Sequence, residues 1–129
     1  MAISCDTSDA PTVIRFKLVD DCASAEELIT LRRALIRAGQ LTAKSCVLVD
    51  LRSAKTLPEL QELLDAFQVD GVWPICRAFV VNNEVQYAMA RQLQSALRTQ
   101  TTINQIFRDE APAMEWLAAL AARAHSIRA

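Results

Sequence analysis

Four stretches of the chain have the apolar pattern of β-strands. Residues 12–19 alternate, with apolar side chains on one face and basic ones on the other, as expected for a strand with one exposed face. Residues 46–51 and 78–81 are apolar almost throughout, which is typical of strands buried on both faces. Residues 102–107 are short and β-branched. The pattern predicts a strand at each of these four places.

An amphipathic helix pattern follows the first and second predicted strands. The first helix is expected to begin at a capping box, Ser24–Glu27, in which the hydroxyl accepts from the Glu27 amide and the carboxylate reaches back. It is expected to end before Gly39, because glycine suits the left-handed residue after a helix. A second capping box, Thr56–Glu59, predicts the start of the second helix.

The third and fourth helices are expected after residues 82–83 and 109, whose side chains suit N-caps. Strict alternation of strands and helices with short connections predicts a parallel sheet with right-handed crossovers. The polar face of the first strand then indicates either an edge position or an open outer face. The fold class predicted from the pattern is therefore α/β, with four strands and four helices.

Composition narrows the picture further. The 129 residues suit one domain, expected at 12–124 between a polar leader at 1–11 and a tail at 125–129. With 14 basic and 15 acidic residues, there is no electrostatic case for nucleic acid. No apolar run is long enough to span a membrane, and the start does not resemble a signal peptide. The cysteines are widely spaced, so we expect no metal, no cofactor and a cytoplasmic protein with reduced thiols.

Candidate functional residues gather at the carboxyl ends of the predicted strands, where parallel sheets tend to bind ligands. Two interpretations stay open: a small polar or anionic binding site, and a set of helix caps and solvated loop ends. On the third helix, an aromatic and a basic residue one turn apart either pack on each other or contact a partner or ligand. The candidates at this edge and on this helix are Asp50, Arg52, Asn82, Asn83, Tyr87, Arg91 and Arg108.

Several motifs together resemble a bacterial family. They are Val47–Arg52, Arg77–Val81, Tyr87–Gln92, Ile106–Glu110 and Ala113–Leu117. This set resembles STAS/SEC14-type domains, also called stage II sporulation AA-like, which include anti-sigma-factor antagonists. The resemblance implies a four-turn βα superhelix with a mostly parallel four-stranded sheet, helices mainly on one sheet face, and no enzymatic activity.

The resemblance also implies a mode of regulation. In antagonists of this superfamily, a serine at the N-terminus of the second helix is phosphorylated to break a partner complex. Here the hydroxyls in the equivalent segment are Ser53 and Thr56, so these are the candidate phosphoacceptors. The first hypothesis is a non-catalytic regulatory module that binds a partner protein or a small ligand.

Two other functions stay open. A SEC14-like carrier of a small molecule or lipid would enclose an apolar cavity. An enzyme would use the edge formed by Asp50, Arg52 and Arg108, and would show a strongly perturbed carboxylate there. Homodimerisation through the exposed edge or outer face of the first strand is a further expectation.

Overall fold

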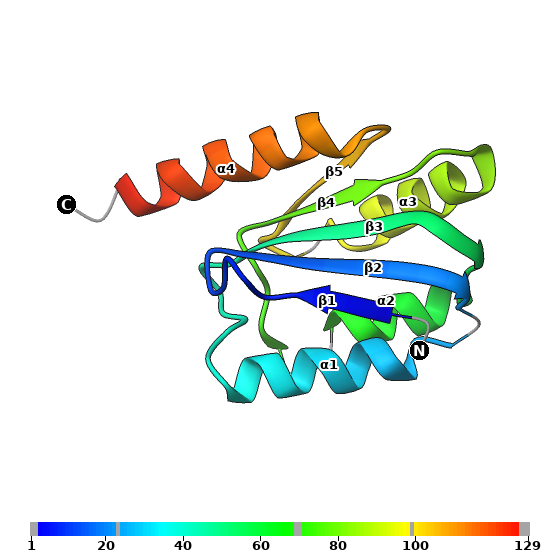
Figure 1. Cartoon of the computed structure of the whole chain (residues 1–129), viewed down its shortest axis with the longest axis horizontal. Coiled ribbons are helices and arrows are strands. Elements are labelled where there is room, and N and C mark those ends of the chain that lie inside the picture. Colours follow the sequence, from blue (N-terminus) through cyan, green and yellow to red (C-terminus); the bar gives the residue numbers. More distant parts are fainter. Residues whose placement is uncertain (1–2, 23, 69–70, 99, 127–129) are drawn as a thin grey trace.

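A five-stranded sheet with four helices forms the whole described structure, a computed structural model that covers residues 3–22, 24–68, 71–98 and 100–126 (Figure 1). The strand order is β1-β2-β3-β4-β5, with β2 to β5 parallel as predicted. The strands are β1 (Ile3–Asp6), β2 (Val13–Asp21), β3 (Cys46–Thr56), β4 (Cys76–Val80) and β5 (Ile103–Phe107). The helices are α1 (Glu26–Arg37), α2 (Leu60–Gln68), α3 (Glu84–Ala96) and α4 (Glu110–Ser126).

The first strand, β1, corrects the predicted strand count from four to five. It lies in the segment expected to be a polar leader and pairs antiparallel with β2, from Ile3 opposite Leu18 to Asp6 opposite Arg15. Its local sequence is too short and too polar to predict a strand. Its position also depends on a contact with a residue far along the chain. The backbone N–H of Ile3 donates to the Glu27 carboxylate on α1 at 3.2 Å. At the other end, α4 extends through Ser126, and residues 127–129 of the expected tail lie outside the described residues.

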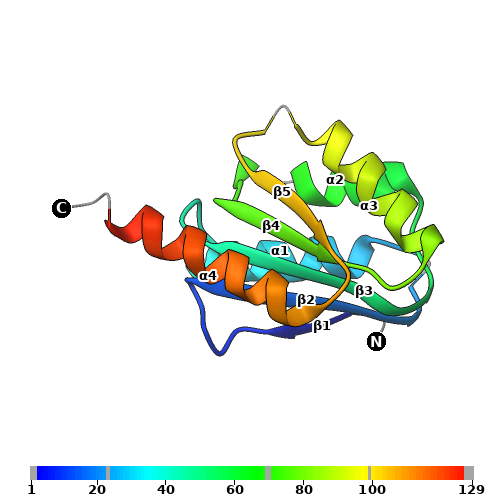
Figure 2. The ribbon, with the colours of Figure 1, turned by 90° about the horizontal axis from the view of Figure 1, so that it is seen from above.

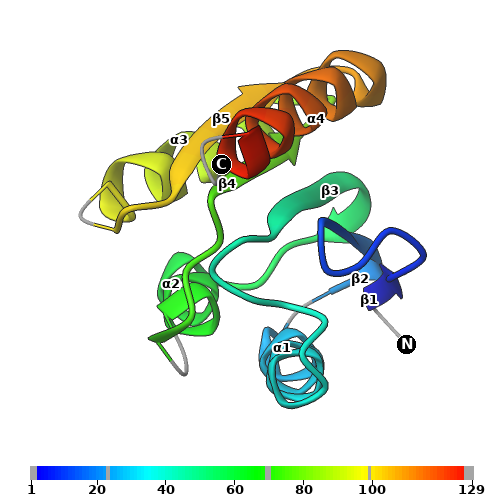
Figure 3. The same ribbon diagram turned by 90° about the vertical axis from the view of Figure 1, so that its left-hand side faces the viewer.

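The helices divide between the two faces of the sheet. Helices α1, α2 and α3 pack on one face, and α4 packs on the other, mainly over β3 and β4 (Figures 1 and 3). This agrees with the expectation of helices mainly on one face. The face that carries α4 leaves the basic side chains of β2 open, so β2 has an open outer face and β1 takes the edge. Seen from above, α4 is the helix that lies in front of the sheet (Figure 2).

A buried arginine lies in the core beneath α2. The Arg77 guanidinium is buried in β4, donates to Asn104 Oδ1 at 2.8 Å, and lies 4.5 Å from the centre of the Phe67 ring. Burial, together with the nearby charge of Arg32, lowers the pKa of Arg77 to about 9. A carboxamide and an aromatic face thus take the place that a counter-ion has for most buried cations.

Helix α1 ends as predicted but does not begin as predicted. Gly39 has φ of +73°, and the amides of Gly39 and Gln40 donate to the Ile36 and Leu35 carbonyls, which is a Schellman motif. At the other end, the expected capping box is wrong. The N-cap is Ala25, one residue later than predicted, so the Ser24 hydroxyl accepts from the Glu26 amide rather than from Glu27, and the Glu27 carboxylate is engaged with β1.

The second expected capping box is also wrong. Thr56 is the last residue of β3, and α2 begins only at Leu60. The Thr56 hydroxyl donates to Asp21 Oδ1 at 3.1 Å, so the side chain links two strand ends instead of capping a helix. The strand continues because β2 pairs with β3 as far as Asp21 opposite Thr56.

None of the helices within the described ranges has the length and apolarity needed to cross a bilayer.

Candidate functional site

A charged cluster joins the middle of β3 to the first turn of α4. Asp50 is only 4% exposed, and its two carboxylate oxygens accept from Arg52 Nε and Nη2, each at 3.0 Å. The Arg52 backbone amide also donates to Asp50 Oδ1 at 3.0 Å. Arg52 Nη2 reaches Glu110 Oε1 at 3.1 Å. The structure therefore brings Asp50 and Arg52 together as predicted, and adds Glu110, which was not among the predicted site residues.

Burial and ion pairing act in opposite directions on Asp50. Burial raises the pKa of this carboxyl, but hydrogen bonds from Arg52 and the charges of Arg52 and Lys17 outweigh burial, so the net pKa lies below its usual value. The same pair raises the pKa of Arg52. A general base or acid for work near neutral pH needs a raised carboxyl pKa. The direction of this shift instead suits a permanent ion pair.

The start of α3 is held by a compact hydrogen-bond network. Asn83 is the N-cap, and its Oδ1 accepts from the Gln86 amide at 2.9 Å, as predicted for this position. Gln86 Oε1 accepts from the Asn82 amide at 2.8 Å. Gln86 Nε2 points the other way, to the carbonyls of Arg52 at 3.4 Å and Ala54 at 3.5 Å. The buried Gln86 thus links two parts of the predicted edge.

Sequence reasoning missed Gln86 as a member of this site. A polar cap residue followed three positions later by Glu or Gln is the capping-box signal, and Asn83-Glu-Val-Gln86 carries it. The same signal failed at Ser24 and at Thr56, so the motif alone does not distinguish the positions. Burial of the glutamine against β3 makes the difference here, and that contact is long-range.

The aromatic residue of α3 pairs with a different arginine from the one expected. The guanidinium of Arg108, after β5, lies 5.0 Å from the centre of the Tyr87 ring and 3.5 Å from Glu84. Arg91 was the expected neighbour of Tyr87 at helical spacing. It instead lines a groove of about 280 Å³ between α3 and β5, together with Tyr87, Gln94, Gln105 and Ile106.

The two candidate phosphoacceptors are exposed but lie within β3, not at a helix N-terminus. Ser53 pairs in register with Val19 of β2, and Thr56 bonds to Asp21. The prediction that this segment begins the second helix is therefore wrong, since β3 runs on through both positions. Whether either hydroxyl is phosphorylated remains a prediction.

A groove of about 230 Å³ lies where β3 ends and α3 begins. It is lined by Ala54, Lys55, Leu57 and the segment Asn83–Gln86. Val85, in the first turn of α3, is 74% exposed beside it. With the half-buried Leu57, it gives this concave surface two larger apolar side chains, and apolar grooves are common at contact sites.

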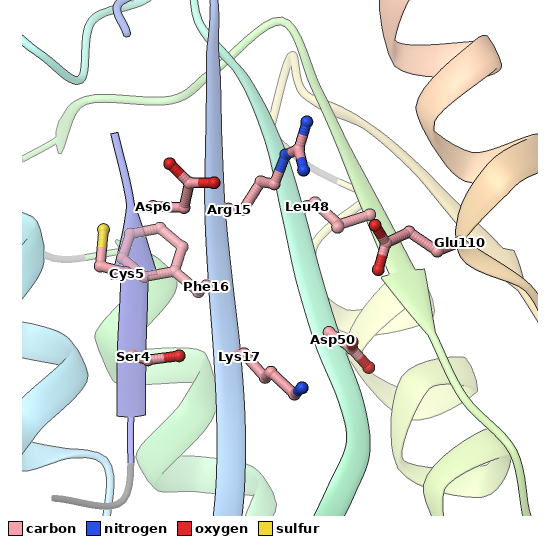
Figure 4. Close-up of a pocket in the computed structure, with 9 residues that line it drawn as sticks. All are labelled: Ser4, Cys5, Asp6, Arg15, Phe16, Lys17, Leu48, Asp50 and Glu110. Carbon is pink, nitrogen blue, oxygen red and sulfur yellow. The ribbon is translucent and has the colours of Figure 1, made fainter. Parts of the chain in front are cut away.

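A third groove, of about 210 Å³, lies on the open half of the sheet, beside α4 (Figure 4). Its wall is strongly charged: Arg15 and Lys17 project from β2, Asp6 from β1, Asp50 from β3 and Glu110 from α4. Opposite charges alternate across this face, so no single sign dominates. Among the described residues, no group of three or more His, Cys, Asp or Glu side chains could hold a metal ion.

Comparison with solved structures identifies the fold. A crystal structure from Shewanella loihica PV-4, described as an uncharacterized protein from the DUF3478 family with a SpoIIAA-like fold, matches with a TM-score of 0.61 and 22% identity. The match covers 90% of this chain and 92% of that one. The chain has a SpoIIAA-like fold. The fold implied by the sequence resemblance is thereby confirmed, with one more strand than predicted.

Two other comparisons gave no match: no protein-family model fits the chain, and no curated protein is similar to it. At 22% identity the shared SpoIIAA-like fold carries no function across.

Proposed function

We propose that this SpoIIAA-like domain is a non-catalytic module that binds a partner protein through the groove beside Val85. The observation that carries the proposal is the exposure of Val85, at 74%, over a concave surface where Leu57 adds apolar area and Lys55 a charge. Apolar anchors with a polar rim are typical of protein interfaces.

The polar groups of the carboxyl edge support binding rather than catalysis. Asp50 has both oxygens engaged by Arg52, and the Asn83 carboxamide is engaged as a helix cap. A catalytic edge needs a nucleophile or a general base free to reach substrate. Instead, Asn83 caps the helix whose first turn lines the groove, and Asp50 is held by Arg52.

Packing between the sheet and helices α1 to α3 favours a surface contact over an internal ligand. The layer is filled by aromatic and aliphatic side chains, and the Phe67 and Phe79 rings meet edge to face with centroids 6.0 Å apart. A lipid carrier would need an apolar cavity of a few hundred Å³ at this level. The free state of all four cysteines supports a cytoplasmic setting for the module.

Phosphorylation of Thr56 would act on this surface by charge. Its hydroxyl donates to Asp21 at 3.1 Å, and a phosphate there would replace a hydrogen bond with repulsion between two anions. Ser53 is exposed, and its hydroxyl has no hydrogen bond to any residue that the structure describes, so a phosphate there would add charge without breaking a contact. A phospho-switch of this module would therefore favour Thr56.

Site-specific photo-crosslinking tests the proposed surface. A benzophenone amino acid would replace Val85 in one variant and the exposed Arg37, in the last turn of α1, in the control. We expect a discrete protein adduct in cells from position 85 and none from position 37. The purified adduct partner should then bind the Val85→Asp variant at least ~10-fold more weakly than the wild type, with unchanged thermal melting. Equal adducts at both positions, or none at either, would contradict the proposal.

A further inference from the structure

Each edge strand of the sheet has a backbone group that is met by a side chain, but the two strands differ in charge, since β1 contains Asp6. At β1, the outward amide of Ile3 is taken by the Glu27 carboxylate. Natural edge strands are usually guarded in this way, or by lysine, proline or bulges. The other edge, β5, reads Ile103-Asn-Gln-Ile-Phe107 and contains no charge and no proline. Ile103 is 53% exposed. Such a strand invites pairing with another extended segment.

The outward backbone groups of β5 follow from its pairing with β4. The Ile103 amide donates to Ile75, and the Phe107 carbonyl accepts from Val81, so these residues face β4. Because successive residues of a strand face opposite sides, Asn104 and Ile106 present their N–H and C=O groups outward.

One of these outward groups is already met by a side chain. The Asn104 carbonyl accepts from Gln94 Nε2 at 2.8 Å, as it would from the amide of a neighbouring strand. Within the described parts of the chain, the outward N–H and C=O of Ile106 have no hydrogen bond. The edge is thus half closed by α3 and open at its carboxyl end.

The groove that borders this edge has a definite charge. Of its lining residues Tyr87, Arg91, Gln94, Gln105 and Ile106, the charged one is Arg91. Arg91 is exposed, and among the described residues it has neither an ion pair nor a hydrogen bond. The positive charge therefore faces solvent beside open backbone groups.

We propose that the β5 edge accepts an extended acidic segment of a partner protein as a sixth strand, with a carboxylate of that segment bound by Arg91. This inference goes beyond the proposed function, since it names a class of partner and uses a different surface from the groove at Val85. Main-chain hydrogen bonds would supply affinity, and the side chains facing α3 would supply selectivity.

A second copy of the chain fits this edge less well. Antiparallel pairing of β5 with its symmetry mate would bring both copies of α3 to the same face of the joined sheet. The two Arg91 side chains would then face one another across the joint, and like charges oppose such pairing. Charge complementarity thus favours an acidic segment.

A phage-displayed library of random 12-residue peptides provides the probe. We expect selection on the wild type to enrich extended sequences with an acidic residue at a fixed place. For an enriched peptide, Arg91→Glu should weaken binding at least ~10-fold, and changing the peptide's acidic residue to lysine should restore it. Val85→Asp should leave peptide affinity unchanged, which separates this surface from the groove at Val85.

A matched pair of substitutions tests the backbone contact. Ile106→Ala and Ile106→Pro both remove the isoleucine side chain, but only proline also removes the outward backbone N–H. Edge strands tolerate proline at positions where the N–H faces away from the sheet. We expect the proline variant to bind the peptide at least ~10-fold more weakly than the alanine variant. If the proline variant does not fold, the charge reversal at Arg91 decides the question.

Hydrogen exchange gives the most direct signature. Peptide binding should slow exchange of the Ile106 amide at least ~10-fold, and leave the Ile103 amide, which already faces β4, unchanged. Three results would overturn the inference: no acidic peptides enriched, binding equally strong in both Ile106 variants, or concentration-dependent dimers that compete with the peptide. A crosslinked partner at Val85 would still stand in each case, so failure here is distinct from failure of the proposed function.

Discussion

Removal of the Arg52 guanidinium tests whether the cluster at Asp50 is a structural brace. Arg52→Met keeps most of the side-chain stem but leaves a carboxylate that is 4% exposed without its bidentate partner. Breaking a buried pair by removing one partner costs about 3–5 kcal/mol. Because the Arg52 side chain is itself 31% exposed, we expect the lower end, about 3 kcal/mol at neutral pH. For a chain of this length that corresponds to roughly 10 °C in melting temperature.

The pH dependence fixes the sign of this effect. In the wild type the pKa of Asp50 is lowered by its partners, so its contribution to stability is present above the unfolded-state pKa and is lost as pH falls through the folded-state pKa. In Arg52→Met, burial acts with little opposition and raises the Asp50 pKa. The variant then gains a proton on acidification and recovers stability. The difference between the two proteins should be largest near pH 7 and should shrink toward about pH 4.

Urea unfolding, followed by the fluorescence of Trp73 and Trp116, measures this difference at each pH. The control is Glu110→Gln, which removes only the more exposed contact of Arg52, with Glu110 44% exposed. Its cost should stay below about 1 kcal/mol. The double variant Asp50→Asn with Arg52→Met should recover part of the loss, because it removes the stranded charge. A deficit that does not change with pH, or an equal deficit in the control, would refute the reasoning.

Three further predictions concern local contacts. Asn83→Ala should cost about 1 kcal/mol in urea unfolding because it removes the N-cap of α3, while the exposed Asn82→Ala should cost much less; equal costs would contradict the cap assignment. Gly39→Ala should also cost about 1 kcal/mol, from its φ of +73° alone, since an added Cβ meets nothing within 4 Å; a stabilised variant would argue against that conformation. Glu27→Gln should speed hydrogen exchange at the Ile3 amide, and unchanged exchange would mean that the edge is held otherwise.

The sequence predicted the parallel part of the sheet because its signals are local. Each of the strands β2 to β5 is preceded or followed by turn residues and has its own apolar pattern, and Gly39 ends α1 as its chemistry requires. Strand β1 has almost no local signal. It forms because it pairs with β2 and because the Ile3 amide donates to the Glu27 carboxylate. The extension of β3 was missed for the same reason: its polar end continues as a strand by pairing with β2.

At the site, the sequence could predict which residues share a sheet edge, but not which side chains contact each other. Asp50 and Arg52 were placed together because they are two residues apart at the end of the predicted strand, although β3 continues to Thr56. Arg108 and Tyr87, by contrast, come from different elements, and their stacking displaces the helical pairing of Tyr87 with Arg91. Helical spacing brings the side chains of Tyr87 and Arg91 within reach of each other. A side chain from another element, here Arg108, can nevertheless take the place of the helical neighbour.

Helix α3 covers the backbone at the end of β3 but leaves part of the β5 edge open. This difference underlies both proposed surfaces. The side-chain amides of Gln86 and Gln94, about two turns apart on α3, each donate to strand carbonyls where a further strand is missing. Gln86 is buried and donates to the carbonyls of both Arg52 and Ala54. These carbonyls at the end of β3 are therefore already bonded, and a partner would contact side chains there. Gln94 is half-buried and bonds to β5 once, at Asn104. Backbone pairing is therefore possible at β5 but not at the end of β3, where contact depends on exposed groups such as Val85.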